Sequence, residues 1–271
     1  MTPDSIEKAA AALVAARREG RLLAELPAAI RPATIAEGYA VQDTFLRQWG
    51  GTISGWKIGA TAKPIMDRFK LSEPFTGPFF AADVMASPAR PKAADHPHLC
   101  IEAEFAFRFA RTLAPRAAPY TRAEVMDAVA SVLPAYELVG PRFERVLFDQ
   151  VPTVIGDCGL NAAFVLGRET TDWRRLDLPG HAVRFLVDGK PRVEGSGAAV
   201  MGDPVTVLEW TANHLSARGI ALAAGQIVST GASCGLIFLE PGETGVADFG
   251  SLGTIEIQFT GPRSQLAVKR G

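Results

Sequence analysis

The alternation of apolar and polar residues is clearest between Cys100 and Phe109, where it predicts a β-strand. One face of this strand is apolar, and the opposite face carries Glu102 and Glu104. Side chains two residues apart on a strand share a face, with Cα atoms roughly 6.5 to 7 Å apart, so the two carboxylates can converge on one cation. Two glutamates on the solvated face of an edge strand are the ordinary alternative. This stretch alone leaves both interpretations open.

Helical spacing of apolar residues predicts two helices before residue 50. The first spans residues 4–18 and stops near Gly20, and the second begins at the capping box Thr34–Glu37 and runs to Gly50. After Gly50 the chain becomes rich in β-branched and aromatic residues with frequent glycine. We therefore expect an N-terminal helical region, residues 1–50, and a β-rich catalytic domain, residues 51–271, that fold as one continuous unit.

Further along, strands predominate and helices are few. A short helix is predicted over 61–70 with its apolar residues inward, a loop over 73–80, and a helix from the capping box at Thr121 to Pro134. Asp188-Gly189 predicts a hairpin turn, and Asp203-Pro204 opens a helix that Gly219 closes. Strands without regular intervening helices indicate an α+β fold with a mostly antiparallel core.

A third acidic residue stands out in the segment Pro134–Val139, where Glu137 is embedded among apolar neighbours. A carboxylate in such a buried strand needs a partner or a metal ion. Glu102, Glu104 and Glu137 would form an all-oxygen site, since no histidine or cysteine lies nearby in the pattern. Oxygen ligands favour a hard cation, Mg²⁺ or Mn²⁺, over zinc.

Lys57 lies between Trp56 and Ile58 in a predicted strand, so it points to the face opposite theirs. If that face is solvent, Lys57 is an ordinary surface lysine. If that face lines a pocket, its ammonium group can hold an anionic substrate or move a proton. The spacing does not choose between these alternatives.

The composition limits the classes of partner. Hydrophobic residues make up 48% of the 271 and charged residues 21%, with a formal net charge of -1. This balance predicts a soluble globular protein with no electrostatic footprint for nucleic acid or an anionic membrane. No apolar stretch has the length of a membrane span, and the three cysteines show no metal or redox spacing. We expect a cytoplasmic protein with free thiols.

Several short motifs follow one another in an order that resembles the 2-keto-4-pentenoate hydratase and 4-oxalocrotonate decarboxylase family, part of the fumarylacetoacetate hydrolase superfamily. The resemblance covers nearly the whole chain, and the ordered set is more specific than any single motif. The motifs are Trp56–Gly59, Glu102–Phe107, Tyr136–Val139, Gly195–Val200, Ser229–Gly231 and Pro241–Glu243.

This resemblance implies a fold and a set of site residues. The fold would be the superfamily's mixed β-roll with a helical N-terminal part. Glu102, Glu104 and Glu137 would hold Mg²⁺ or Mn²⁺, Lys57 would hold the substrate carboxylate or relay a proton, and Asp83 is a second candidate acid or base. The implied substrate contacts are Leu160, Asn161, Gly197, Thr230 and Gly231.

One segment departs from the family pattern, which has Asp-Asn followed by small residues and a serine near the substrate. This chain has Cys158 and Leu160 there, with Asn161 one place further on. The departure leaves open a different substrate or reaction class.

The implied activity is a metal-dependent lyase that hydrates 2-hydroxy-2,4-dienoates to 4-hydroxy-2-oxo acids in aromatic catabolism. The alternative is a decarboxylase of a 2-oxo-enedioate of the 4-oxalocrotonate type, which would pass through the same enolate. Hydrolysis of a C–C bond in an acylpyruvate ranks third. The family's habit implies a homo-oligomer, and related hydratases and decarboxylases associate with one another.

Overall fold

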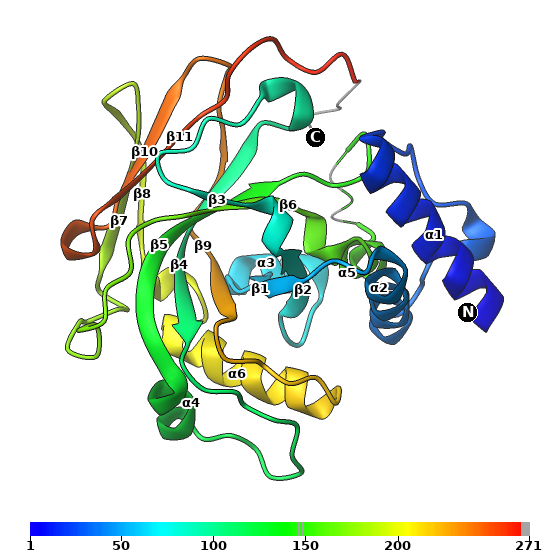
Figure 1. Cartoon of the computed structure of the whole chain (residues 1–271), viewed down its shortest axis with the longest axis horizontal. Helices are drawn as coiled ribbons and strands as arrows, with labels where there is room; N and C mark the ends of the chain where they lie inside the picture. Colours follow the sequence, from blue (N-terminus) through cyan, green and yellow to red (C-terminus); the bar gives the residue numbers. More distant parts are fainter. Residues whose placement is uncertain (146, 148, 267–271) are drawn as a thin grey trace.

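The structure is a computed structural model that describes residues 1–145, 147 and 149–266 (Figure 1). The last five residues of the predicted 51–271 domain thus lie outside the described part. The strands are β1 (Ile53–Gly59), β2 (Phe75–Phe80), β3 (Val84–Ala86), β4 (Cys100–Phe109), β5 (Val129–Val139), β6 (Asn161–Leu166), β7 (Ala182–Val187), β8 (Lys190–Ser196), β9 (Ile227–Phe238), β10 (Thr244–Asp248) and β11 (Thr254–Gln258). The α-helices are α1 (Pro3–Glu19), α2 (Ile35–Trp49), α3 (Lys63–Phe69), α4 (Arg122–Ala128), α5 (Val151–Gly156) and α6 (Pro204–Ala217).

The strands form two sheets. The seven-stranded sheet has the order β2-β1-β9-β4-β5-β6-β3, and the four-stranded sheet has the order β11-β10-β7-β8. Only the pairs β1–β9 and β3–β6 are parallel among those described. In Figure 1 the smaller sheet lies at one end of the molecule, and α1 and α2 lie at the other. The predicted α+β fold with a mixed, mostly antiparallel core and an N-terminal helical region is confirmed.

Strand β4 is a central strand, hydrogen-bonded to β9 on one side and β5 on the other. Its apolar face, including Phe105 and Phe107, lies in the main hydrophobic core. The ring of Phe105 packs edge-on against Phe249, with centroids 5.1 Å apart. The opposite face of β4 is covered as well, and Glu104 is fully buried. The alternative of a solvated edge strand is therefore wrong.

The N-terminal helices begin and end as the sequence predicts. Thr34 and Glu37 form the capping box of α2, and Gly20 and Gly50 close the two helices in left-handed conformation. Apolar residues of both helices share a hydrophobic cluster with Phe143 and Ile155 from later in the chain. Because this cluster crosses residue 50, the helices pack as part of the body. The boundary itself stays a prediction.

Two local predictions are wrong. The helix that opens at Thr121 ends at Ala128, and the chain continues as β5 through Pro134. The spacing of Val125, Val129 and Val132 fits a helix, but pairing with β4 and β6 buries both faces of this segment as a strand. Pro134 takes part in the sheet through its carbonyl, which accepts a hydrogen bond from the backbone N–H of Gly167. The predicted loop over 73–80 is largely the buried strand β2.

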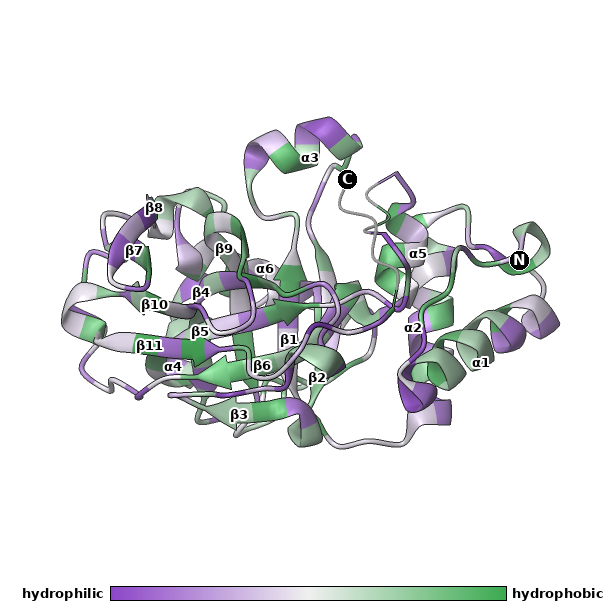
Figure 2. Ribbon diagram, turned by 90° about the horizontal axis from the view of Figure 1, so that it is seen from above, coloured by the Kyte–Doolittle hydropathy of each residue, from purple (hydrophilic) through white to green (hydrophobic). Residues whose placement is uncertain are grey.

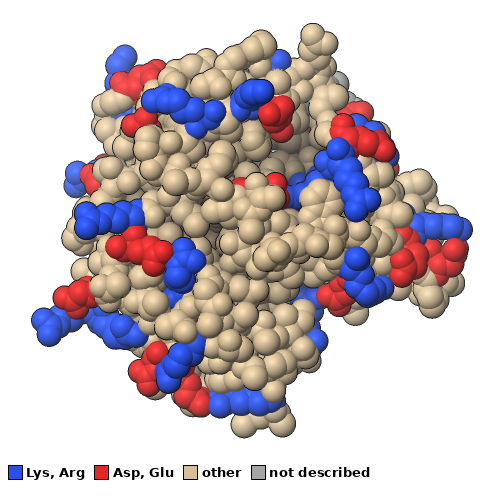
Figure 3. All heavy atoms as spheres, in the orientation of Figure 1, with Lys and Arg blue, Asp and Glu red and all other residues tan. Residues whose placement is uncertain are grey.

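Helix α3 forms over the predicted residues, but none of them is buried, so the expectation of inward apolar residues is wrong. Figure 2 shows α3 projecting from the rest of the fold. Its residues Ile65 and Phe69 line a cavity instead of the core. No described helix combines the length and apolar character needed to cross a membrane. The face drawn in Figure 3 carries acidic and basic side chains side by side.

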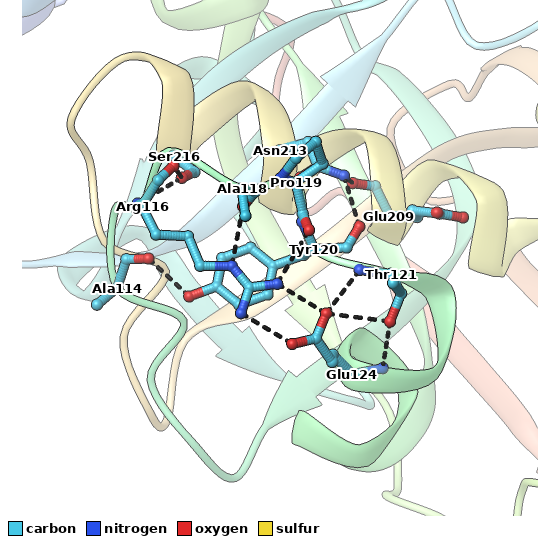
Figure 4. A network of polar contacts seen from close by, with 10 residues as sticks. All are labelled: Ala114, Arg116, Ala118, Pro119, Tyr120, Thr121, Glu124, Glu209, Asn213 and Ser216. Carbon is cyan, nitrogen blue, oxygen red and sulfur yellow. Dashed lines mark hydrogen bonds and ion pairs between the residues drawn. The ribbon is translucent and has the colours of Figure 1, made fainter.

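A polar network fastens the loop before α4 to α6 (Figure 4). Asn213 accepts a hydrogen bond from the backbone N–H of Tyr120 at 2.7 Å and donates one to its carbonyl at 3.0 Å. Arg116 lies over the ring of Tyr120, 3.6 Å from the centroid, and pairs with Glu124 of the second capping box. This network holds the start of α4, the helix that leads into β5.

We expect Asn213→Ala to lower the free energy of unfolding by about 2 kcal/mol, since the two hydrogen bonds to the Tyr120 backbone are lost. Asn213→Asp keeps the acceptor and should lose about half as much. The midpoint of urea unfolding measures both. An unchanged midpoint in the alanine variant would contradict this role.

Candidate metal centre and substrate cavity

Strand pairing brings the three predicted glutamates together. Glu102 lies directly opposite Glu137 in the register of β4 and β5, and Glu104 is two residues along the same face of β4. One carboxylate oxygen from each lies within 4.8 Å of the others. Glu104 and Glu137 are fully buried, whereas Glu102 reaches a cavity. The three carboxylates thus converge at the inner end of that cavity.

Glu104 is held by strand β9. Its Oε2 accepts a hydrogen bond from the hydroxyl of Ser229 and one from the backbone N–H of Gly231 at 2.9 Å. Gly231 has φ +96, and a Cβ there would lie 2.2 Å from the hydroxyl of Thr61, so only glycine fits. The other oxygen, Oε1, is buried with no hydrogen-bond partner among the described residues. A buried carboxylate oxygen in this state is available as a ligand atom for a cation.

Lys57 belongs to the site and not to the surface. Its Nζ lies 3.1 Å from Oε2 of Glu137 and donates to the carbonyl of Gly159 at 2.9 Å. The side chain is buried, so the alternative of a surface lysine is wrong. Lys57 reaches the glutamates because β1 lies beside β9, where Lys57 is opposite Ser229.

The carbonyl that holds Lys57 comes from a tight turn after α5. Cys158, Gly159 and Leu160 all have positive φ, at 52°, 68° and 69°. This conformation is strained for Cys158 and Leu160, which have side chains. A Cβ on Gly77 would lie 2.2 Å from the carbonyl of Cys158, so β2 approaches the turn closely only because residue 77 is glycine.

Asn161 connects the third glutamate to a buried frame of arginines. Its amide donates to Oε1 of Glu137 at 3.2 Å. Its backbone carbonyl accepts from Arg142 at 2.6 Å and from Arg17 at 3.1 Å. Arg142 is fixed in turn by Asp157, with 2.6 Å between its Nε and the carboxylate. Asn161 therefore orients Glu137, and Arg142 fixes Asn161.

The pKa values in the cluster are set by burial and by the excess of three carboxylates over one ammonium group. Burial raises the pKa of Glu137 to about 7, against the opposing attraction of Lys57. Burial also raises the pKa of Glu102 and Glu104, with added repulsion from the other carboxylates at Glu104. Burial disfavours the charge on Lys57, yet the three carboxylates together raise its pKa. Three acids around one lysine leave a deficit of positive charge that a divalent cation would fill.

The donor set fits a hard cation. All three groups are carboxylates, and oxygen donors without sulfur or nitrogen suit Mg²⁺, Mn²⁺ or Ca²⁺. The unpartnered Oε1 of Glu104 marks the place where a ligand atom is available. The hydrogen bonds from Asn161 and Ser229 hold the carboxylates from behind, as outer-shell partners do in metal sites.

A cavity of about 660 Å³ opens beside the cluster. It lies between β8 and β9 on one side and α3, α5 and the 158–160 turn on the other. Lys57 and Glu102 form its inner end. This volume lies in the range of sites for small molecules, about 300 to 1,000 Å³.

The other predicted site residues are placed differently. Leu160 and Gly231 line the cavity. Thr230 does not line the cavity, and its hydroxyl donates a hydrogen bond to the carbonyl of Phe105 at 2.9 Å. Gly197 packs against the carbonyl of Leu178, beside the lining residues of β8. Asp83 lies outside this cavity.

Asp83 forms an ion pair with Arg17 at 2.6 Å and borders a second, smaller cavity. Its candidate role as acid or base stays a prediction that this placement does not support. The sequence alone does not point to Arg142 and Asp157, because their role depends on tertiary contacts of Arg142 with Asp157 and with the Asn161 carbonyl. Ser229 was noted only as part of a motif.

Residues 75–260 match the family described as fumarylacetoacetate (FAA) hydrolase C-terminal. The chain belongs to the fumarylacetoacetate hydrolase family. Among curated relatives of this family member, a 2-hydroxyhexa-2,4-dienoate hydratase from Comamonas testosteroni is 31% identical, over 94% of this chain and 97% of that one. A 4-oxalocrotonate decarboxylase from Pseudomonas putida is 28% identical, over 83% of this chain and 86% of that one.

Solved structures show the same fold for the family member. The 4-oxalocrotonate decarboxylase from Pseudomonas putida G7 superimposes with a TM-score of 0.87 at 23% identity, covering 96% of this chain and 98% of that one. That structure is a complex with magnesium and adipate. A second structure of the same enzyme contains calcium and acetate; it has a TM-score of 0.86, 23% identity and the same coverage of both chains. The predicted family and its fold are thereby confirmed.

The affinity of this protein for a divalent metal ion should rise as the pH rises from about 6 to about 8. Carboxylates must lose their protons to bind a cation, and the pKa of Glu137 lies near 7 before metal is bound. Titration calorimetry with Mg²⁺ and Mn²⁺, in buffers of different ionisation enthalpy, should record protons released at the lower pH. Equal affinity at both ends of this range would contradict the raised pKa.

Asn161→Ala should weaken metal binding about 10- to 100-fold, the usual loss when an outer-shell partner is removed. The fold should persist, because the backbone carbonyl that holds Arg142 remains. Gln48→Ala removes an exposed amide of α2 and serves as the control with unchanged affinity. Wild-type metal affinity in Asn161→Ala would show that Glu137 is held in place without this hydrogen bond.

Proposed function

We infer that the protein is a metal-dependent lyase that adds water to 2-hydroxy-2,4-dienoates and forms 4-hydroxy-2-oxo acids. The observation that carries this proposal is the group of three converging glutamates with Lys57 at the inner end of a small-molecule cavity. Curated hydratases that match over nearly the whole chain support it. Glu102, Glu104 and Glu137 would hold the cation, which we propose to be Mg²⁺ or Mn²⁺.

When bound, the cation supplies positive charge that stabilises the enolate form of a 2-oxo acid. The chain's own residues bind and orient the substrate. Lys57 lies 5.9 Å from the ring centroid of Phe75 and at the inner end of the cavity, where its ammonium group can receive the C1 carboxylate. Its contact with the Gly159 carbonyl keeps it in this position.

Net hydration requires proton transfers as well as water. The enol proton leaves O2, C5 gains a proton, and the elements of water add across C3 and C4. Lys57, at the inner end of the cavity, can hold or relay a proton at O2. The neighbouring carboxylates raise its pKa and so favour the charged ammonium form. Asp83 remains a proposed second acid or base, although it lies outside the cavity.

Decarboxylation of a 2-oxo-enedioate is the second candidate. A 4-oxalocrotonate decarboxylase matches the chain at 28% identity. Loss of CO₂ would pass through the same enolate and needs no attacking water. Room for a second carboxylate decides between the two reactions. A homo-oligomer, and its association with a related decarboxylase or hydratase, are also proposed, as is a cytoplasmic location.

The test uses metal-stripped protein with 2-hydroxypenta-2,4-dienoate and, separately, 2-oxo-3-hexenedioate. Ultraviolet absorbance follows the reaction and NMR identifies the products, before and after Mg²⁺ or Mn²⁺ is added. We expect metal-dependent formation of 4-hydroxy-2-oxopentanoate. Release of CO₂ from the diacid without hydration of the dienoate would make the protein a decarboxylase.

Glu104→Gln should abolish most metal binding and activity, by roughly 10³-fold or more in kcat, because the unpartnered carboxylate oxygen is lost while the shape of the side chain is kept. Gln48→Ala should keep wild-type turnover. Circular dichroism checks that both variants are folded. Full activity in Glu104→Gln would overturn the assignment of the metal centre.

A further inference from the structure

One side of the cavity is a continuous apolar surface. We call it the apolar wall; it consists of Phe75, Val139, Val151, Val154 and Leu160. These five side chains belong to one hydrophobic cluster that extends into the N-terminal helices. They come from β2, β5, α5 and the 158–160 turn. Helix α3, which projects from the fold in Figure 2, also lines the cavity with Ile65 and Phe69.

The apolar wall begins directly beside the catalytic groups. Val139 is two residues from Glu137 on β5 and therefore lies on the same face. Leu160 follows Gly159, whose carbonyl holds Lys57. A substrate whose C1 carboxylate lies at Lys57 and the glutamates therefore extends its remaining carbons along the wall.

Charged side chains in the described lining are confined to two places. Lys57 and Glu102 are at the inner end and are already committed to the cluster. Arg68 on α3 and Glu194 on β8 are exposed. The opposite side is formed by residues of β8 and β9 that are mostly small, including Ser196 and Ser233. A second carboxylate placed against the wall would lose water and meet no cation among the five wall residues. Arg68, the other cation of the described lining, lies on the exposed helix α3 and not in the wall.

Resting on the function proposed above, we propose that the substrate is a monoacid: a 2-hydroxy-2,4-dienoate with an apolar substituent of several carbons at C5. The apolar wall receives this substituent. The wall disfavours a second carboxylate at the distal end, and this selects hydration of monoacids over decarboxylation of diacids. The cavity of about 660 Å³ has room for such a tail beyond a five-carbon acid.

The experiment compares kcat/KM, in the presence of Mg²⁺, for 2-hydroxypenta-2,4-dienoate and for homologues with methyl, propyl or pentyl groups at C5. A compound with a terminal carboxylate, matched in length to the pentyl homologue, completes the series. We expect about a fourfold gain per added methylene until the wall is covered, the factor for burying one CH₂ group. The carboxylate-ended compound should be at least 100-fold poorer than its alkyl counterpart.

Val151→Lys tests the wall itself, since Val151 is its half-buried member at the start of α5. The new cation should raise kcat/KM for the carboxylate-ended compound relative to the pentyl homologue by at least tenfold. Ile35→Lys makes the same change at an exposed apolar residue outside the cavity and should keep the wild-type ratio. If the lysine variant does not fold, Val151→Thr replaces it as a smaller change. The threonine variant should lower the gain in kcat/KM per added methylene.

The outcomes separate this inference from the proposed function. Hydration of the five-carbon dienoate with no gain from alkyl groups, or with a preference for the carboxylate-ended compound, would overturn the apolar-tail assignment and leave the hydratase intact. If no dienoate of any length is hydrated, the proposed function itself fails. A rising alkyl series with rejection of the distal carboxylate supports both.

Discussion

The gathering of three carboxylates, two of them fully buried, beside a single ammonium group is the constraint on which the rest of this structure depends. Unpaired charges are costly inside a protein, and the chain offers several compensations at once. Ser229 and Gly231 donate to Glu104, Asn161 donates to Glu137, and burial raises the pKa of all three acids. A divalent cation would remove the remaining deficit of positive charge.

The surrounding chain is shaped to serve these contacts. The left-handed turn at 158–160 stores backbone strain where the Gly159 carbonyl reaches Lys57. Arg142 and Asp157 stabilise that turn from the interior, and Gly77 allows β2 to approach it. These residues do not line the cavity and are not neighbours in the sequence. They nevertheless fix the positions of Lys57 and Glu137.

The departure from the family pattern at Cys158 and Leu160 has a structural explanation. Cys158 is buried in the cluster behind the cavity, and burial raises the pKa of its thiol to about 12, which disfavours the thiolate. Leu160 faces the cavity as part of the apolar wall. The family resemblance implies a polar side chain at this place, whereas this chain presents the hydrocarbon side chain of Leu160 to the cavity.

The sequence by itself determined the elements whose signals are local. Alternation predicts β4, two capping boxes mark the starts of α2 and α4, and the ordered motifs point to the family and to Glu102, Glu104 and Glu137. These signals are local because strand periodicity and helix caps depend on residues within one or two turns of the chain.

Only the tertiary structure decided which strands are neighbours. That order makes β4 central and buries Glu104, and it turns the end of the helix predicted to reach Pro134 into β5. It also pairs Asp83 with Arg17 outside the cavity and places Arg142 behind Asn161. The spacing of residues along the sequence indicates which side chains share a face of a strand or helix. The charge and the environment of that face depend on segments that are far apart in the chain.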